Sequence, residues 1–239
     1  EHIVDAAIKA LRDGHHGYTP AQGILPLREA VSRDLNRRHS VDVAPRNVVI
    51  MPGGKPTMFF AVLMFGGPGT EIMYPDPGFP IYRSMIEYIG SKPVPIALRE
   101  ENGFAFSAEE VLAQITPATR LIIINTPGNP TGGAVPTEEI EKLAAGLEKH
   151  PDVALMSDEI YSQMLYDGRE HESLLKYPSL KDRLILLDGW SKNYAMTGWR
   201  LGFSVWPDAL VEPVVRLAVN CHSCVNAPTQ YAGIAALEG

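Results

Sequence analysis

The stretch SKNYAMTGWRLG, residues 191–202, follows an apolar run, Leu184–Leu187, that predicts a buried strand. We expect the turn after this strand to withdraw part of the Lys192 side chain from water. Desolvation disfavours the ammonium form and lowers the pKa of a lysine, which gives an amine able to form a Schiff base with an aldehyde. Ser191 supplies a hydroxyl and Arg200 a fork of donors that suits phosphate. This combination indicates pyridoxal phosphate, although most such pairs are simply a surface lysine near a surface arginine.

Strand and helix patterns alternate along the whole chain. Apolar runs predict strands at 47–51, 71–74 (ended by Pro75), 92–98, 121–124, 153–157, 184–187 and 201–205. Apolar spacing and capping signals predict helices at 3–12, 26–38, 56–65, 108–115, 207–219 and 228–237, and others from PDPGFPIY to about Ile89 and from Thr137 to near His150. The alternation predicts an α/β fold of three layers, a mainly parallel sheet with helices on both faces. No internal repeat or linker interrupts it, so we expect one domain, residues 1–239.

Composition narrows the class of function. The net charge of −7 gives no basic footprint, which argues against nucleic-acid binding. No apolar run approaches the roughly 20 residues that span a bilayer, and no signal peptide is recognisable, so we expect no membrane partner. The cysteines, Cys221 and Cys224, are too few for a disulfide framework and lack a second pair to complete a structural zinc site. We therefore expect no metal and a reducing, cytoplasmic location.

Two kinds of turn after predicted strands suggest ligand binding. The glycines of PGGKP (52–56) connect a strand to a helix, and the free N–H groups and dipole of such a helix start bind phosphate. Paired glycines also occur in such turns for purely steric reasons. Polar residues follow two other strands, in Asn125–Gly132 and at Asp158 and Glu159. Open α/β sheets bind ligands at the carboxyl ends of their strands, so we expect a site there.

Six motifs occur in an order that resembles the class I/II aminotransferases, the fold-type I pyridoxal-phosphate enzymes that include aspartate aminotransferase. They are GYTPAQGILPLREA (17–30), PGGKP (52–56), PDPGFPIY (75–82), NTPGNPTG (125–132), SDEIY (157–161) and the lysine stretch. Each motif is weak alone, but six in one order are a strong signal. Family members also have an N-terminal arm and a C-terminal small domain, which carries the arginine for the substrate α-carboxylate. No residue here matches that arginine, so the chain resembles the large, cofactor-binding domain alone.

The resemblance implies a phosphate site. The backbone at Gly54 and Lys55 contributes to it, together with Ser191 and Arg200. Tyr18 is expected to reach the cofactor phosphate of a neighbouring subunit, which implies a homodimer with active sites at the subunit interface. Without the resemblance, Tyr18 is only an amphipathic anchor in a loop.

The resemblance also implies a ring site. Phe79 is expected to stack on the pyridine face, and Asn129 to hold the phenolic oxygen. Tyr161, on the same face of an expected helical turn as Asp158, helps Asn129. The carboxylate of Asp158 pairs with the protonated ring nitrogen, the electron sink of the chemistry. A core phenylalanine and a helix N-cap are the ordinary alternatives for Phe79 and Asp158.

The expected activity is a ping-pong aminotransferase acting on amino acids and 2-oxo acids. Lys192 would hold pyridoxal phosphate as a Schiff base and then move the α-proton as general base and acid. Asn129 and Lys55 are candidate substrate contacts. The resemblance to bacterial-type aspartate aminotransferases implies that Lys55 holds the distal carboxylate of aspartate or glutamate. A cation at a helix N-terminus opposes the helix dipole, which invites a functional explanation, unless Lys55 only points into solvent. A pyridoxal-phosphate β-lyase or decarboxylase and a non-catalytic sensor remain alternatives.

Overall fold

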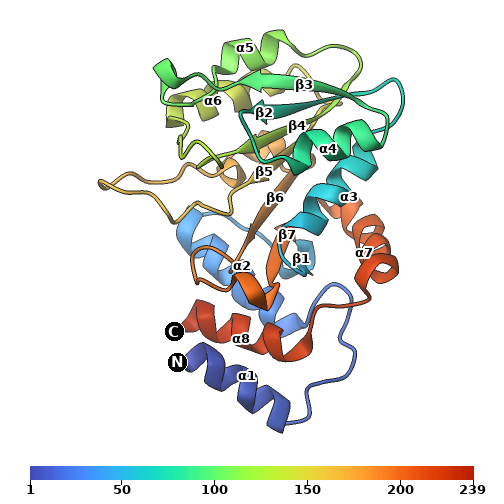
Figure 1. The fold of residues 1–239 in the computed structure, drawn as a ribbon, viewed down its shortest axis with the longest axis vertical. Helices are drawn as coiled ribbons and strands as arrows, with labels where there is room; N and C mark the ends of the chain where they lie inside the picture. Colours follow the sequence, from blue (N-terminus) through green and yellow to red (C-terminus); the bar gives the residue numbers. More distant parts are fainter. The chain divides into compact units, whose positions relative to one another are not determined.

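The computed structural model describes residues 1–239, and the chain divides into two compact units. Unit 1 comprises residues 1–57 and 187–239, and unit 2 comprises residues 58–186. Strand β6 (Leu184–Gly189) begins in unit 2 and ends in unit 1. Figure 1 labels the helices and strands of each unit. The assignment of one domain to the whole chain stays a prediction.

Unit 2 is built on parallel strands. They are β2 (Glu71–Asp76), β3 (Lys92–Ala97), β4 (Thr119–Asn125) and β5 (Ala154–Asp158), in the order β6-β5-β4-β2-β3. The pairs β2–β3, β2–β4 and β4–β5 are all parallel. Strand β5 is buried along its whole length, as its apolar start, Ala154–Met156, predicts for an inner strand covered on both faces.

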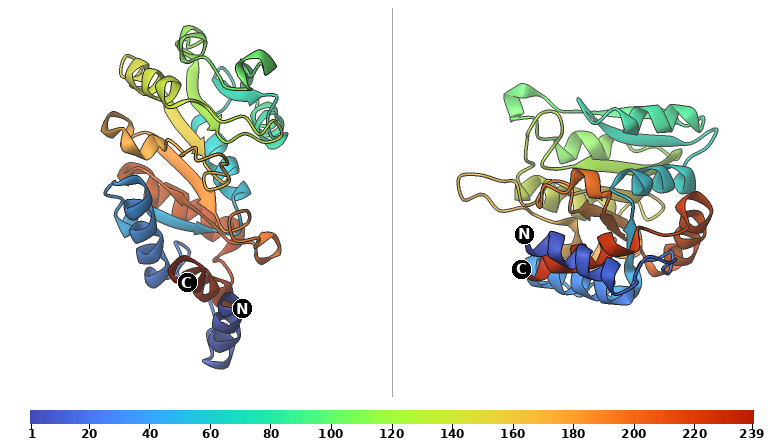
Figure 2. Two further views of the ribbon diagram at one scale, coloured as in Figure 1. Left: turned by 90° about the vertical axis from the view of Figure 1, so that its left-hand side faces the viewer. Right: turned by 60° about the horizontal axis from the view of Figure 1, so that its bottom comes forward.

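Helices cover both faces of this part of the sheet. They are α3 (Lys55–Phe65), which starts in unit 1, α4 (Ile81–Tyr88), α5 (Ala108–Ala113) and α6 (Thr137–Leu147). One buried cluster joins Val111 of α5 and Leu143 of α6 to Ile122 and Ile124 of β4. Figure 2 shows α6 on one side of the strands and α4 on the other. The expectation of helices on both faces is therefore confirmed for unit 2.

Unit 1 contains an antiparallel strand pair and four further helices. Strands β1 (Val48–Met51) and β7 (Gly202–Val205) pair antiparallel, and β7 lies next to β6. The helices are α1 (His2–Arg12), α2 (Leu25–His39), α7 (Asp208–His222) and α8 (Ala227–Glu238). Helix α8 packs against both α1 and α2. The sheet is therefore mainly parallel, as expected, with one antiparallel pair.

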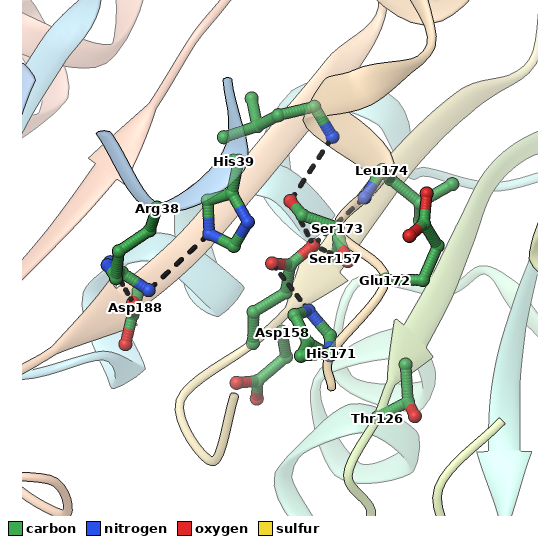
Figure 3. A network of polar contacts seen from close by, with 12 residues as sticks. Arg38, His39, Thr126, Ser157, Asp158, His171, Glu172, Ser173, Leu174 and Asp188 are labelled. Atoms are coloured by element: carbon green, nitrogen blue, oxygen red, sulfur yellow. Dashed lines mark hydrogen bonds and ion pairs between the residues drawn. The ribbon is translucent and has the colours of Figure 1, made fainter. Parts of the chain in front are cut away.

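A buried ion network attaches α2 to β6 within unit 1. Arg38 Nε lies 2.7 Å from Asp34 Oδ2 on its own helix, and Arg38 Nη2 lies 3.3 Å from Asp188 Oδ2 on β6. Figure 3 shows Arg38 directed at Asp188, with His39 beside it. Because all three charged groups are largely withdrawn from water, losing one of them would leave an uncompensated buried charge.

The predicted elements form close to their expected positions, with one clear correction. The prediction that Pro75 ends its strand is wrong, because β2 continues through Pro75 to Asp76. The backbone carbonyls of Thr70 and Asp76 accept hydrogen bonds from the β3 side, and the Glu71 N–H donates to the β4 side. Because successive residues of a strand bond to alternate neighbours, Pro75 is directed towards β4. The pairing of β2 with β4 ends at Met73. Pro75 therefore faces a side where no partner needs its missing N–H.

No helix of the chain is both long and apolar enough to cross a membrane.

Candidate functional site

The carboxyl ends of β4 and β5 carry the polar residues that the sequence places there. Asn125 and Asp158 end their strands in direct register. The Asn125 side-chain Nδ2 donates to the Asp158 backbone carbonyl at 3.0 Å, and its Oδ1 accepts from the backbone N–H of Asn129 at 2.9 Å. One amide side chain thus ties the two strand ends to the loop that carries Asn129.

Asp158 is a buried carboxylate, only 2% exposed. Its Oδ2 accepts a hydrogen bond of 2.6 Å from the Tyr82 hydroxyl on α4, and its Oδ1 accepts one of 3.3 Å from the Ile160 N–H. Burial raises the pKa of Asp158 to about 6; the two hydrogen bonds oppose this rise and the nearby charge of Glu159 adds to it. Burial and the Asp158 carboxylate in turn raise the pKa of Tyr82 well above its usual value. The carboxylate is therefore held by neutral donors.

The helix N-cap explanation for Asp158 is wrong. After β5 the chain forms hydrogen-bonded turns, in which the Ser162 N–H bonds the Glu159 carbonyl and the Met164 N–H bonds the Tyr161 carbonyl. A turn does form around Tyr161, as expected, but its bonds do not continue into a helix. The bond from Ile160 to Asp158 is instead a local turn contact.

Asn129 and Tyr161 lie together, as the ring-site expectation requires. Asn129 Nδ2 is 3.4 Å from the Tyr161 hydroxyl, and both residues are half-buried. Phe79, also half-buried, lies just before α4 and meets Tyr82 edge-on, with ring centroids 6.2 Å apart and an interplanar angle of 77°. Through Tyr82, the aromatic residue expected against the pyridine face is linked to the buried carboxylate.

In unit 1, the glycine turn and Arg200 lie in contact. Gly53 has φ +85°, and a Cβ at this position would lie 2.2 Å from Arg200 Nη2. Two guanidinium nitrogens donate to backbone carbonyls, Nη1 to Thr197 at 2.7 Å and Nη2 to Pro52 at 3.4 Å. A guanidinium has five N–H donors, so this arrangement leaves donors for an anion. The turn therefore needs glycine both for its backbone angle and for the space that Arg200 fills.

A cavity of about 660 Å³ lies beside Arg200 in unit 1. Its wall includes Pro52, Trp199 and, from the segment before α8, Val225 and Asn226. Arg200 therefore borders a concave surface with room for a small ligand group.

The expected desolvation of Lys192 is not observed. Lys192 is exposed, and Ser191 beside it is half-buried. The turn directs other residues inward, since Trp190 and Met196 are 0% and 2% exposed. A buried strand thus predicted the position of the turn correctly, but not which of its side chains is withdrawn from water.

Other expected residues of unit 1 are exposed as well, whereas Gly54 is half-buried. Tyr18 is 92% exposed, and Lys55 at the start of α3 is exposed. Both cysteines are free thiols, and no group of three or more His, Cys, Asp or Glu side chains could hold a metal ion.

Sequence reasoning missed Tyr82 as part of this region, and it gave Asn125 and Glu159 no role beyond their place at the strand ends. Tyr82 is one helical turn beyond Phe79 in the same motif, and that spacing was the only available signal. Asn125 is the last residue of β4, a position that already suggested ligand binding. Glu159, 2% exposed, is a second buried carboxylate next to Asp158.

Changing Asp158 to Asn should alter how the stability of the cofactor-free protein depends on pH. The folded-state pKa of Asp158 lies above its unfolded value, so its contribution is complete below the unfolded pKa and is lost as the pH rises through about 6. At roughly 1.4 kcal/mol per pKa unit, the wild type should lose on the order of 3 kcal/mol relative to Asp158→Asn between about pH 4 and pH 7. Urea unfolding of both proteins across this range measures the difference.

Tyr82→Phe is the matched variant for this measurement. It removes the hydrogen bond that lowers the pKa of Asp158, so the pH window should move upward. Parallel stability curves for the wild type and Asp158→Asn would contradict the assignment of a raised pKa to Asp158.

Relatives with known names match the chain along its whole length. It is 35% identical over 240 residues to the aspartate aminotransferase of Geobacillus stearothermophilus. It is 37% identical over 239 residues to the aromatic-amino-acid aminotransferase 2 of Thermococcus litoralis. Each alignment covers 100% of this chain and 61% of the relative, so the chain spans about three fifths of their length.

Solved structures and a family model agree with these matches. An aromatic aminotransferase from Pyrococcus horikoshii superposes with a TM-score of 0.95 at 33% identity, covering 100% of this chain and 64% of that one. A Thermus thermophilus aspartate aminotransferase with maleate gives a TM-score of 0.93 at 33% identity, covering 99% and 61%. The family model for aminotransferase class I and II matches residues 1–239. The chain therefore belongs to the class I and II aminotransferases, a family of pyridoxal-phosphate-dependent enzymes.

Proposed function

We propose that this chain is the cofactor-binding part of an aminotransferase that moves an amino group between an amino acid and a 2-oxo acid. The observation that carries the proposal is the buried carboxylate of Asp158, which has a phenol and a backbone N–H as partners. A buried carboxylate with a raised pKa lacks a positive charge close by. A protonated pyridine nitrogen would provide that charge.

The residues of unit 2 fit the ring of pyridoxal phosphate. Asp158 would hold the ring nitrogen, with Tyr82 fixing the orientation of its carboxylate. Asn129 and Tyr161, whose polar groups lie 3.4 Å apart, would hold the phenolic oxygen. Phe79 would cover the ring face. The Asp158 carboxylate would accept from the protonated ring nitrogen, and the Asn129 amide and Tyr161 hydroxyl would donate to the phenolic oxygen.

The residues of unit 1 fit the phosphate. Gly54 precedes helix α3 and Lys55 begins it, and the N–H groups and dipole of a helix start favour an anion. Arg200 keeps donors available next to Gly53, and Ser191 adds a hydroxyl. We assign the phosphate to these residues and the covalent attachment of the cofactor to Lys192.

Bound pyridoxal phosphate would supply an aldehyde and a protonated ring that withdraws electrons from the substrate α-carbon. The chain supplies the proton transfers. We assign to Lys192 Nζ the removal of the α-proton and its later return. Asp158, kept ionised by the ring cation, would maintain the charge of the ring throughout.

Borohydride reduction of the protein with bound pyridoxal phosphate should attach the pyridoxyl group to Lys192 alone. The reason is that an amine must be held at the cofactor aldehyde to be trapped. Peptide mapping by mass spectrometry reads the site directly, and Lys192→Ala should carry no label. A label spread over several lysines would remove Lys192 from the proposal.

The substrate class we propose is acidic amino acids, because of Lys55. Lys55 is an exposed cation at the start of α3, where the helix dipole disfavours positive charge. The printed names of the relatives include both aspartate and aromatic-amino-acid aminotransferases, so family membership leaves the choice open. The role we assign to Lys55 is contact with the distal carboxylate of the substrate.

Replacing Lys55 by Ala should lower kcat/KM for aspartate far more than for alanine, by at least about tenfold in the ratio, because only aspartate carries the second carboxylate. Steady-state kinetics on both substrates give the ratio. Lys149→Ala, which changes an exposed lysine just after α6, is the control. Equal losses on both substrates would indicate a role at the phosphate and end the acidic-substrate assignment.

We also propose that the protein is a homodimer. Tyr18 is 92% exposed, as expected of a residue that acts on a second subunit. On α1, Val4, Ile8 and Leu11 are 48%, 40% and 53% exposed. Their spacing of four and three residues places them on one helix face, which gives an apolar surface suited to association.

Ile8→Glu should weaken the dimer by at least about tenfold, because a charge in an apolar interface is costly to bury. Sedimentation equilibrium measures the dissociation constant. Asp5→Lys on the same helix is the control for a change of charge alone. If the wild type is a monomer at working concentration, both the dimer and the role of Tyr18 must be abandoned.

A further inference from the structure

Next to Asp158 lies a second buried carboxylate that the proposed chemistry does not use. The Glu159 side chain is 2% exposed, and the His171 side chain that contacts it is 7% exposed. Burying an ionised carboxylate costs several kcal/mol unless it is paired and hydrogen-bonded. A group of this kind, one residue from the carboxylate assigned to the ring nitrogen, requires a physical explanation.

The partners of Glu159 come from both ends of one loop. Oε1 accepts from Ser157 Oγ at 2.9 Å, from Ser173 Oγ at 3.1 Å and from the Leu174 N–H at 3.3 Å. Oε2 lies 2.7 Å from His171 Nε2, which must carry the hydrogen because a carboxylate only accepts. Figure 3 shows Ser157, His171, Ser173 and Leu174 converging on this point.

These contacts close a loop of the chain. Ser157 lies on β5, whereas His171 and Ser173 lie where the chain returns to a 3₁₀ turn, Leu174–Lys176. Residues 166–170, in between, are all exposed and form no helix or strand. An exposed segment without helix or strand contributes little packing that could fix the course of the chain after β5. The Glu159 carboxylate provides that constraint.

The two residues assigned to the cofactor ring flank Glu159. Asp158 precedes it, and Tyr161, whose hydroxyl meets Asn129, follows two residues later. We propose that Glu159 and His171 form a positioning pair, which closes the loop and thereby holds Asp158 and Tyr161 in place for the cofactor. This inference rests on the proposed function and adds two positioning residues to it.

His171→Ala should raise the dissociation constant of pyridoxal phosphate by at least about tenfold, since losing a partner that orients ligand-holding groups costs roughly 10–100-fold in affinity at metal sites. His171→Gln should restore most of the affinity, because the Gln side-chain amide can reach the position of Nε2 and donate to Glu159. Titration of the cofactor-free protein with pyridoxal phosphate, followed by absorbance, gives the constants.

Two controls separate positioning from general stability. Glu172→Gln changes the neighbouring carboxylate, whose partners Lys176 and Tyr177 are local, and should leave affinity unchanged. Arg183→Ala removes hydrogen bonds to the Leu147 and His150 carbonyls elsewhere in unit 2, and should lower the unfolding temperature without changing affinity. If His171→Ala fails to fold, Ser173→Ala removes one donor from the same carboxylate and should weaken binding in the same direction.

The outcomes are distinguishable. Wild-type affinity in folded His171→Ala and Ser173→Ala would overturn the positioning pair while leaving the proposed function intact. A His171→Gln variant as weak as His171→Ala would also overturn it, because the donor to Glu159 would then be irrelevant. A wild-type protein that does not bind pyridoxal phosphate would instead contradict the proposed function itself.

Discussion

The ionised carboxylate at the end of a fully buried strand is the constraint from which the rest of unit 2 can be understood. Asp158 cannot reach water, so the protein must supply what water would have supplied. Tyr82 does so from α4, and the backbone of Ile160 does so from the turn. Both partners are neutral, which leaves the site short of a positive charge. The protein therefore carries an electrostatic cost at this position that a cationic ligand would offset.

The same cost explains why so much polar structure gathers at this end of the strands. Asn125 fixes the backbone of Asp158 and the start of the Asn129 loop. Glu159 adds a second negative charge, and this charge raises the pKa of Asp158. The Glu159 carboxylate is itself held by four hydrogen-bond donors. In unit 1, Gly53 also meets two requirements at once, because it provides both a left-handed backbone turn and the space that Arg200 fills. The candidate site thus contains polar groups that are buried and therefore need hydrogen-bond partners from the protein.

Sequence predicted the fold well because its signals are local and strong. Runs such as Leu121–Ile124 allow little besides a strand buried on both faces, and the alternation with helices implies parallel pairing. The end of β2 was predicted too early, because it depends on which neighbouring strand Pro75 faces, and the local sequence does not determine that. Asp158 and Asn129 could be predicted from the sequence, because strand ends are where such sheets bind ligands. Tyr82 and His171 could not be predicted, since they act through partners 76 and 12 residues away in the sequence. Lys192 shows the opposite failure, because strand patterns do not reveal which turn residues face solvent.

In the proposed function, the buried carboxylate of Asp158 holds a protonated pyridine nitrogen. Nitrogen-15 NMR of pyridoxal phosphate labelled at the ring nitrogen tests it directly, because the chemical shift reports whether that nitrogen carries a proton. In the wild type the ring nitrogen should remain protonated at neutral pH, and in Asp158→Asn it should lose the proton. The same shift in both proteins, with the cofactor bound in each, would contradict the account.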